Sequence, residues 1–243
     1  MNINILDDPK QLGEEAGSTA AQAIQVAISR QGYANIILAT GSSQFATLQK
    51  LTSESIDWSR VRMFHLDEYI GLTASHPASF RRYLKERFLQ LVPPLLEGIL
   101  INGEVPDPGE ECHRLGALIE ENPIDVALIG IGENGHLAFN DPPADFSTLD
   151  AYHVVQLDQA CREQQVGEGW FADWQAVPAT AISMSIPQIL RSKKLIVSVP
   201  DSRKAHAVRC CVHGPIDPQC PASILQQHPD CHLFLDRNAA VLL

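Results

Sequence analysis

The chain has 243 residues, of which 45% are hydrophobic and 19% are charged. This composition is typical of a globular protein that is long enough to bury a full core. Its apolar runs, such as 36–39 and 195–199, are far shorter than a segment that crosses a membrane. Residues 1–17 contain neither a basic region nor a long apolar run, so they do not resemble a signal peptide. We therefore expect a cytoplasmic protein with no membrane partner.

The formal net charge of the chain is -11. An acidic balance of this size argues against a nucleic-acid partner, because binding to phosphate backbones requires clustered lysine and arginine side chains. The longest basic cluster falls on a helical pattern interleaved with apolar residues, and it consists of Arg81, Arg82, Lys85 and Arg87. We predict that these four side chains form the solvated face of a helix.

Helical and strand patterns alternate along the chain. A regular apolar spacing predicts a helix over residues 13–30, and a second helix is predicted from about Gln44. Short apolar runs predict six strands, at residues 35–40, 61–66, 125–130, 181–185, 195–199 and 232–235. Strands that alternate with helices form βαβ units. We therefore predict a Rossmann-like α/β fold, with a mostly parallel sheet flanked by helices, in a single domain over residues 1–243.

Parallel sheets bind ligands at the carboxyl ends of their strands, so the residues that come after each strand are candidates for function. The first buried strand is followed by Thr40-Gly41-Ser42-Ser43. A turn of small residues before a helix offers N–H groups and hydroxyls to an anion, and phosphate is the natural ligand. An ordinary strand-to-helix turn with a serine N-cap explains the same residues equally well. Near the fifth strand, Lys204 would add positive charge for a phosphate, although a solvent-exposed lysine is the simpler explanation by itself.

Two adjacent carboxylates, Asp67 and Glu68, follow the second strand. Like charges repel where burial begins, so one of the two is a candidate general base whose pKa is set by a cleft. An N-cap followed by an acid in the first turn of a helix is the alternative, and the local pattern favours it by a small margin.

Residues 125–143 read DVALIGIGENGHLAFNDPP, in which three glycines match the dinucleotide-binding fingerprint. That fingerprint requires a long helix after the glycines, and the two consecutive prolines forbid one. We therefore predict a loop that presents Asn134, His136, Asn140 and Asp141. A histidine near a carboxylate suits proton transfer at neutral pH.

Six cysteines occur in the chain, at positions 112, 161, 210, 211, 220 and 231. None forms a C-x-x-C pair, and two of them are adjacent, so we predict free thiols. A zinc site formed by Cys220, His228, Cys231 and His232 is conceivable, but the spacing matches no common finger or ribbon. We predict no metal.

These segments together resemble the glucosamine-6-phosphate deaminase/isomerase family, whose relatives include the 6-phosphogluconolactonases. The resemblance extends over nearly the whole chain, through Thr40-Gly41-Ser42, Asp67-Glu68-Tyr69, 132–142, Lys204-Ala205, Gly214-Pro215 and 221–228. The sequence GHLAFNDP, with DEYIGL upstream, resembles the deaminase branch, whereas the lactonases carry a GHTAS-type sequence at this place.

The resemblance implies a Rossmann-like α/β domain, no metal and no redox cofactor. It implies a small-molecule sugar phosphate as partner, with glucosamine 6-phosphate and water converted to fructose 6-phosphate and ammonia. Asp67 would move a proton between C2 and C1 of the opened sugar, and His136, oriented by Asp141, would assist ring opening. The phosphate would be held by Gly41, Ser42, Ser43 and Lys204.

Three positions depart from the family pattern. Asn134 stands where the typical loop, GxDGH, has an acid, and Asp141 is shorter than the usual glutamate. Counting back from the Val-Pro of the family leads to Gly169, where the family's phosphate-contacting arginine is missing. Arg162 and Arg203 are the candidates to replace that arginine.

These departures leave two alternatives open. One is another sugar-phosphate isomerase or a lactone hydrolase on the same fold. The other is a non-catalytic sugar-phosphate-sensing domain, which predicts an attached helix-turn-helix and loss of the proton-transfer residues, whereas this chain retains Asp67 and His136. The sequence leaves the oligomeric state open, and a homo-oligomer is compatible with it.

Overall fold

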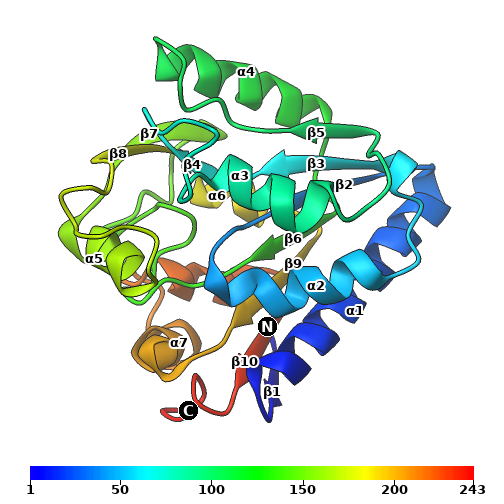
Figure 1. Ribbon diagram of the computed structural model, residues 1–243. Coiled ribbons are helices and arrows are strands. Elements are labelled where there is room, and N and C mark those ends of the chain that lie inside the picture. Colours follow the sequence, from blue (N-terminus) through cyan, green and yellow to red (C-terminus); the bar gives the residue numbers. More distant parts are fainter.

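Seven parallel strands form the main sheet, in the order β1-β10-β9-β6-β2-β3-β5 (Figure 1). The computed structural model describes residues 1–243. In sheet order, the strands are Asn2–Leu6, Cys231–Asp236, Lys194–Val199, Val126–Ile129, Ala34–Leu38, Val61–His65 and Glu97–Ile99. The predicted mostly parallel sheet is confirmed, and its interior strand β2 is buried along its whole length.

A second, three-stranded antiparallel sheet has the order β4-β8-β7. Its strands are Asp67–Tyr69, Thr180–Met184 and Tyr152–Gln156. The strand predicted at 181–185 therefore exists, but it lies in this sheet rather than in the parallel one. An apolar run of this length shows that a strand is buried, and it does not show which sheet the strand joins.

Helices cover both faces of the main sheet. They comprise α1 (Pro9–Gln31), α2 (Phe45–Ser53), α3 (Phe80–Leu84), α4 (Pro108–Glu121), α5 (Gln159–Gly167), α6 (Ile186–Leu190) and α7 (Ala205–His213). None of them combines the length and the apolar composition that crossing a bilayer requires.

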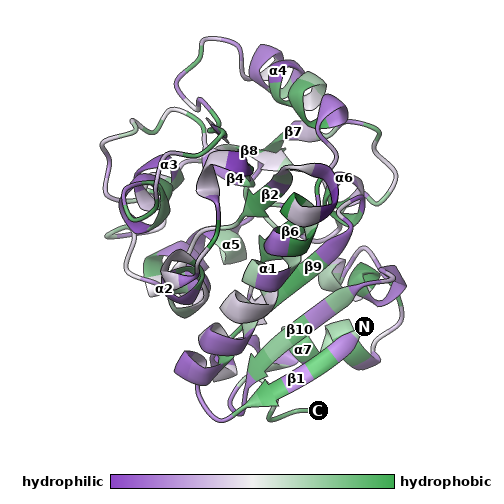
Figure 2. Ribbon diagram, turned by 90° about the vertical axis from the view of Figure 1, so that its right-hand side faces the viewer, coloured by the Kyte–Doolittle hydropathy of each residue, from purple (hydrophilic) through white to green (hydrophobic).

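Successive strand residues point into two separate cores, as expected for a pleated sheet. On β2, Ile36 and Leu38 join the core beneath α1, α2 and α3, whereas Ile37 joins the opposite core with side chains of α4, α6 and α7. In Figure 2, β2 and β6 are mostly hydrophobic, while α1 and α4 alternate between hydrophilic and hydrophobic residues. The result is a three-layer α/β domain.

Helix α1 fixes the position of α2, which comes directly after the predicted anion-binding turn. The side chain of Asp8 caps α1 by accepting a hydrogen bond from the Gln11 N–H at 2.8 Å. On the face of α1 that meets α2, Gly13 and Gly17 have no side chains, and a Cβ at Gly13 would overlap Ala46. This close packing holds the start of α2 against the sheet.

The chain reverses its direction across the sheet between β2 and β6. Strands β2, β3 and β5 succeed one another outward, and α4 then returns the chain to β6 on the other side of β2. A crevice for ligands forms at such a switch point, beyond the carboxyl ends of the two strands. The turns after β2 and β6 are those in which the sequence predicts functional residues.

The cysteines differ in part from the prediction of six free thiols. Cys210 and Cys220 are joined in a disulfide, whereas the other four cysteines are free and buried. The two partners are ten residues apart, and their meeting depends on the turn after α7, so no local spacing rule reveals it. This bond also removes Cys220 from the conceivable zinc site.

Candidate active site

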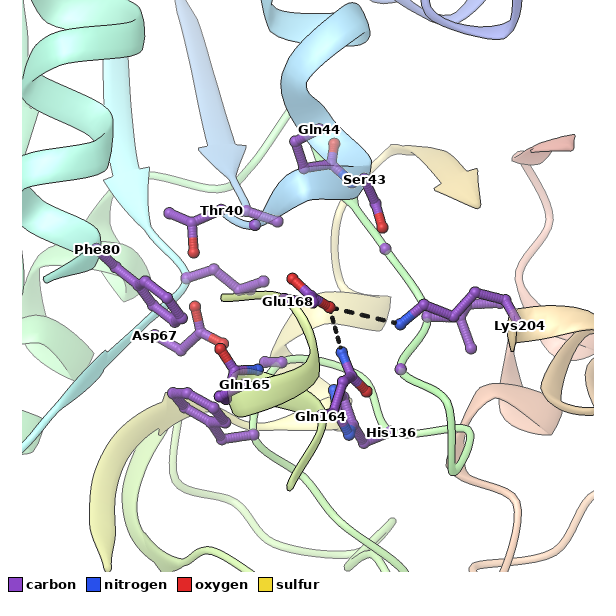
Figure 3. A pocket seen from close by; sticks show the side chains of 18 residues that line it. Thr40, Ser43, Gln44, Asp67, Phe80, His136, Gln164, Gln165, Glu168 and Lys204 are labelled. Atoms are coloured by element: carbon purple, nitrogen blue, oxygen red, sulfur yellow. Dashed lines mark hydrogen bonds and ion pairs between the residues drawn. The ribbon is translucent and has the colours of Figure 1, made fainter. Parts of the chain in front are cut away.

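A cavity opens at the switch point between β2 and β6 (Figure 3). It is lined by the turns that come after these two strands, by Asp67 and Phe80, by the end of α5, and by Lys204. The free cavity between the side chains measures about 70 Å³. The cavity brings together residues from six separate segments of the sequence.

Asp67 is the first residue of β4 and lies at the wall of the cavity. The residue is only 6% exposed. Burial, and then the neighbouring charge of Glu68, raise the pKa of Asp67 to about 8. A carboxyl group with such a pKa can exchange a proton with a ligand near neutral pH.

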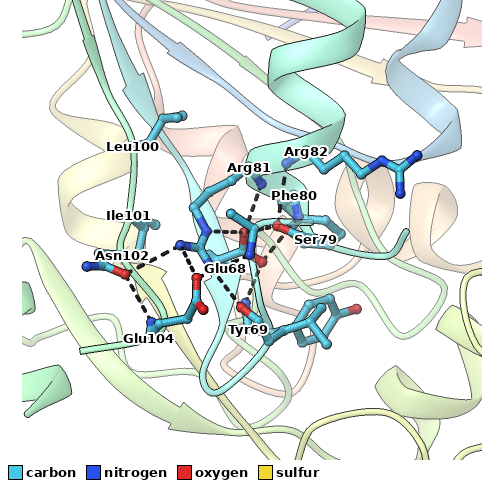
Figure 4. A network of polar contacts seen from close by, with 12 residues as sticks. Glu68, Tyr69, Ser79, Phe80, Arg81, Arg82, Leu100, Ile101, Asn102 and Glu104 are labelled. Carbon is cyan, nitrogen blue, oxygen red and sulfur yellow. Dashed lines mark hydrogen bonds and ion pairs between the residues drawn. The ribbon is translucent and has the colours of Figure 1, made fainter. Parts of the chain in front are cut away.

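Glu68 has a different role from its neighbour, because it does not line the cavity and its carboxylate lies in a network of donors (Figure 4). The donors are the N–H groups of Tyr69, Phe80 and Arg81, the Ser79 hydroxyl and the Arg81 guanidinium. All five bonds are between 2.8 and 3.2 Å long. Glu68 therefore ties β4 to the start of α3 and holds Asp67 in place.

The prediction of a solvated basic helix face is wrong for Arg81. This residue is only 9% exposed, and its guanidinium lies 3.2 Å from Glu68 and 3.0 Å from Glu104. A buried carboxylate needs a charged or hydrogen-bonding partner, and a helical pattern of basic residues does not show which of them supplies it. Lys85 and Arg87 are exposed, as expected.

His136, Asp141 and Asn134 form a connected group in the loop after β6. The His136 Nδ1 atom lies 3.2 Å from Oδ1 of Asp141, which is within ion-pair distance, and it makes no hydrogen bond. The Asn134 amide donates to the same Asp141 oxygen at 3.0 Å, and its carbonyl accepts from the His136 N–H at 3.1 Å. Burial would raise the pKa of Asp141, but the nearby His136 imidazole and the Asn134 amide outweigh it and lower this pKa. Asp141 is thus an ionised partner for the imidazole.

The glycines of this loop serve the histidine rather than a nucleotide. No helix follows Gly135, in agreement with the expected effect of the two prolines. A Cβ at Gly132 would overlap the His136 ring, and the Gly132 N–H donates to the His136 carbonyl at 3.0 Å. Gly135 adopts a φ of 87°, which few other residues tolerate. The loop folds tightly and places His136 at the cavity wall.

The predicted anion-binding residues lie on the opposite side of the cavity. Gly41, Ser43 and Lys204 line it, whereas Ser42 lies beside it, in the short 3₁₀ turn that leads into α2. The Tyr83 hydroxyl donates to the Gly41 carbonyl at 2.9 Å and so fixes the turn. The side chain of Lys204 is only 3% exposed. The solvent-exposed alternative for this lysine is therefore wrong.

Glu168 lines the cavity, although no sequence pattern predicted it as a site residue. It comes directly after the last residue of α5, and its side chain is only 5% exposed. Its carboxylate accepts from the Gln164 amide at 2.8 Å and from the Ser42 hydroxyl at 3.1 Å, and it lies 4.0 Å from the Lys204 Nζ atom. The only signal in the sequence is an acid next to Gly169, where the family's arginine is missing.

Neither candidate for the missing arginine lines the cavity. Arg162 donates to the Val177 carbonyl at 2.8 Å, and its guanidinium stacks on Trp174. Arg203 forms ion pairs with Asp201 and Glu133. Lys204 is therefore the only lysine or arginine of the cavity.

One group of side chains could offer ligands to a metal ion. The ligand atoms of His136, Asp141 and Cys161 lie within 4.8 Å of one another. Burial raises the pKa of the Cys161 thiol well above its ordinary value, whereas a thiol must lose its proton to bind a metal. Asp141 is also already engaged by His136, so we assign no metal to this group.

Proteins of known function resemble the chain over nearly its whole length. The family model for glucosamine-6-phosphate isomerases/6-phosphogluconolactonase matches residues 7–233. The glucosamine-6-phosphate deaminase of Listeria monocytogenes serotype 4a is 38% identical over 229 residues, which cover 94% of this chain and 96% of that protein. The glucosamine-6-phosphate deaminase of Lactobacillus delbrueckii subsp. bulgaricus is 32% identical over 243 residues, which cover 100% of both proteins.

Solved structures show the same relationship. A monomeric glucosamine-6-phosphate deaminase superposes with a TM-score of 0.93 at 31% identity, and the match covers 100% of both chains. A 6-phosphogluconolactonase from Trypanosoma brucei superposes with a TM-score of 0.81 at 18% identity, over 100% of this chain and 98% of that one. The second likeness concerns the fold alone. The predicted resemblance is confirmed, and the chain belongs to the family of glucosamine-6-phosphate isomerases and 6-phosphogluconolactonases.

Proposed function

We propose that this protein is a glucosamine-6-phosphate deaminase, which converts glucosamine 6-phosphate and water to fructose 6-phosphate and ammonia. The observation that carries the proposal is the arrangement of one cavity. Asp67 and His136 lie at its walls, together with the anion-binding turn and Lys204, and Asp141 contacts His136 from outside the cavity lining. The similarity to deaminases at 31–38% identity supports this reaction over lactone hydrolysis.

Ring opening is the first step, and we assign it to His136. Because its Nδ1 atom faces Asp141, the neutral imidazole carries its proton there and leaves Nε2 free as an acceptor. Nε2 takes the proton of the C1 hydroxyl, and the imidazolium gives this proton to the ring oxygen as the C1–O5 bond breaks. Asp141 stabilises the imidazolium formed on the way.

Isomerisation comes next, and we assign it to Asp67. Its carboxylate removes the proton from C2 while the C1 carbonyl oxygen gains a proton, which gives an enolamine. Asp67 then returns a proton to C1, and the double bond moves to C2 and the nitrogen. Water adds to this C2 imine, and ammonia leaves as the C2 ketone of fructose 6-phosphate forms. A base whose pKa lies near the working pH is well suited to such a two-way transfer.

Binding of the phosphate determines which carbon atoms of the sugar lie next to Asp67. The N–H groups and hydroxyls of residues 41–43, together with Lys204, would hold it at the far side of the cavity. With both ends of the sugar held, the reaction becomes effectively unimolecular, which is a major source of rate enhancement.

The test is ammonia release from glucosamine 6-phosphate by the wild-type protein, Asp67→Asn and a control, Asp150→Asn. Asp150 is exposed and lies outside the cavity. We expect Asp67→Asn to lose at least about a hundredfold in kcat and to incorporate no solvent deuterium at C1, while Asp150→Asn keeps both activities. Hydrolysis of 6-phosphogluconolactone without ammonia release would refute the deaminase assignment.

A further inference from the structure

The Glu168 carboxylate lies beside the residues that are assigned to binding the substrate phosphate (Figure 3). One of its oxygens accepts from the Ser42 hydroxyl at 3.1 Å, and the other lies 4.0 Å from the Lys204 Nζ atom. A Cβ at Gly41 would contact the same carboxylate at 3.9 Å. Glu168 therefore lies against three of the four residues of the predicted anion site.

The cavity is too small for a sugar phosphate while Glu168 remains there. Its free volume is about 70 Å³, whereas pockets for small molecules measure roughly 300 Å³ or more. In Figure 3, the Glu168 side chain projects into the middle of the cavity, between Thr40 and Lys204. Its departure would open the space beside the anion-binding turn.

Charge leads to the same conclusion. Lys204 is the only lysine or arginine of the cavity, and Glu168 is the nearest carboxylate to it. A phosphate that entered beside Glu168 would share one buried cation with a second anion. Two buried anions that share a single cation repel one another strongly. The phosphate and the Glu168 carboxylate therefore do not occupy the site together.

We propose that Glu168 is an internal competitor for the substrate phosphate and thereby lowers the affinity of the site for every ligand that carries a phosphate. This inference rests on the proposed function. The phosphate displaces the Glu168 carboxylate from Ser42 and Lys204, and the carboxylate turns out toward solvent. Gly167 and Gly169 flank it, and Gly169 has a φ of 81° with no atom near the place of a Cβ, so the backbone can accommodate this turn.

The competition weakens the binding of inorganic phosphate and of a sugar phosphate by the same factor, because both must displace Glu168. Glu168 occupies the anion site in most molecules of the free protein, and a phosphate can bind only where the site is free. The apparent affinity of any phosphate ligand is therefore reduced in proportion to the fraction of molecules with a free site. A sugar phosphate bears the same cost, but its further contacts with the cavity leave it the tighter ligand. Inorganic phosphate is therefore expected to bind weakly to the wild-type protein.

The experiment compares the wild-type protein with Glu168→Gln, Glu168→Ala and Glu163→Gln. Glu163 is exposed on α5, the helix that precedes Glu168, and its side chain pairs only with Gln159, so its variant is a control for the loss of one charge. Binding of inorganic phosphate is measured by calorimetry, and KM for glucosamine 6-phosphate is measured from ammonia release. Thermal unfolding shows that each variant is folded.

We expect both Glu168 variants to bind inorganic phosphate about tenfold more tightly, the usual worth of a charged hydrogen bond, and to lower KM by a similar factor. Glu163→Gln should change neither constant. Unchanged or weaker phosphate binding in both folded Glu168 variants would overturn the inference, because Glu168 would then support Lys204 rather than compete with the phosphate. Calorimetry measures phosphate binding even if the protein releases no ammonia. The inference about Glu168 can therefore be refuted separately from the proposed function.

Discussion

Asp67 must be ionised to accept a proton from C2, so its raised pKa predicts how the rate depends on pH. With a pKa of about 8, about one-tenth of the free protein is ionised at pH 7 and about nine-tenths at pH 9. We therefore expect kcat/KM for glucosamine 6-phosphate to rise about tenfold between pH 7 and pH 9. An ordinary aspartate would give a flat profile over this range.

The same pKa makes a prediction that requires no substrate. The folded state keeps the Asp67 proton up to about pH 8, whereas the unfolded chain loses it at its ordinary pKa of 3.8. The stability that Asp67 contributes therefore falls as the pH rises from about 4 to about 8. Relative to Asp67→Asn, whose amide does not titrate, the wild type should lose about 1.4 kcal/mol of unfolding free energy for each pH unit in this window.

Urea unfolding at half-unit steps between pH 5 and pH 8.5 measures this difference, and Asp150→Asn serves as the control. The difference between Asp67→Asn and the wild type should grow steadily and become constant above about pH 8. If that difference is the same at pH 5 and pH 7, Asp67 has an ordinary pKa. The assignment of Asp67 as a base tuned by burial would then be wrong.

Three further substitutions probe other parts of the site. Lys204→Met should raise KM for glucosamine 6-phosphate about tenfold to a hundredfold, because a charged hydrogen bond to the phosphate is lost. Arg81→Leu should destabilise the fold by about 3–5 kcal/mol, measured by denaturant unfolding, because Glu68 is left buried without its cation. Asn134→Asp should lower kcat about tenfold or more, since it replaces the donor 3.0 Å from Asp141 by a second carboxylate.

Each of these predictions has a contrary outcome. An unchanged KM in Lys204→Met would remove this lysine from phosphate binding. For the buried pair, the double variant with Glu68→Gln should recover part of the lost stability, and a loss equal to that of Arg81→Leu alone would show that the ion pair is not the cause. A higher kcat in Asn134→Asp than in the wild type would mean that the loop lacks an acid it needs.

The sequence predicted the centre of the fold because buried parallel strands are continuous apolar runs. The strands at β2, β6, β9 and β10 follow this rule over most of their length, whereas β3 has Arg62 within its apolar run. It fails for β1, in which Asn2 and Asn4 alternate with apolar residues, and for β5, which has only three residues. An edge strand buries only one of its faces, or only a small part of both faces. Its hydrophobic sequence pattern is therefore weak.

The predicted site residues stand in the segments that follow strands in the sequence. The structure brings Gly41, Ser43, Asp67, His136 and Lys204 to one cavity, and it leaves Ser42, Asn134 and Asp141 outside the cavity lining. Two features could not be predicted in this way, for the same physical reason. Glu168 comes after a helix rather than a strand, and its partners Ser42 and Lys204 are distant in sequence. Arg81 lies on a helix among exposed basic residues, and only tertiary packing shows that it neutralises Glu68.

The most direct test of the account is a single reaction of the purified protein with glucosamine 6-phosphate, in which ammonia and fructose 6-phosphate are measured together. The proposed function predicts that both products appear at the same rate and in equal amounts. A protein that binds the sugar phosphate and releases neither product would contradict the assignment of this cavity as a deaminase active site.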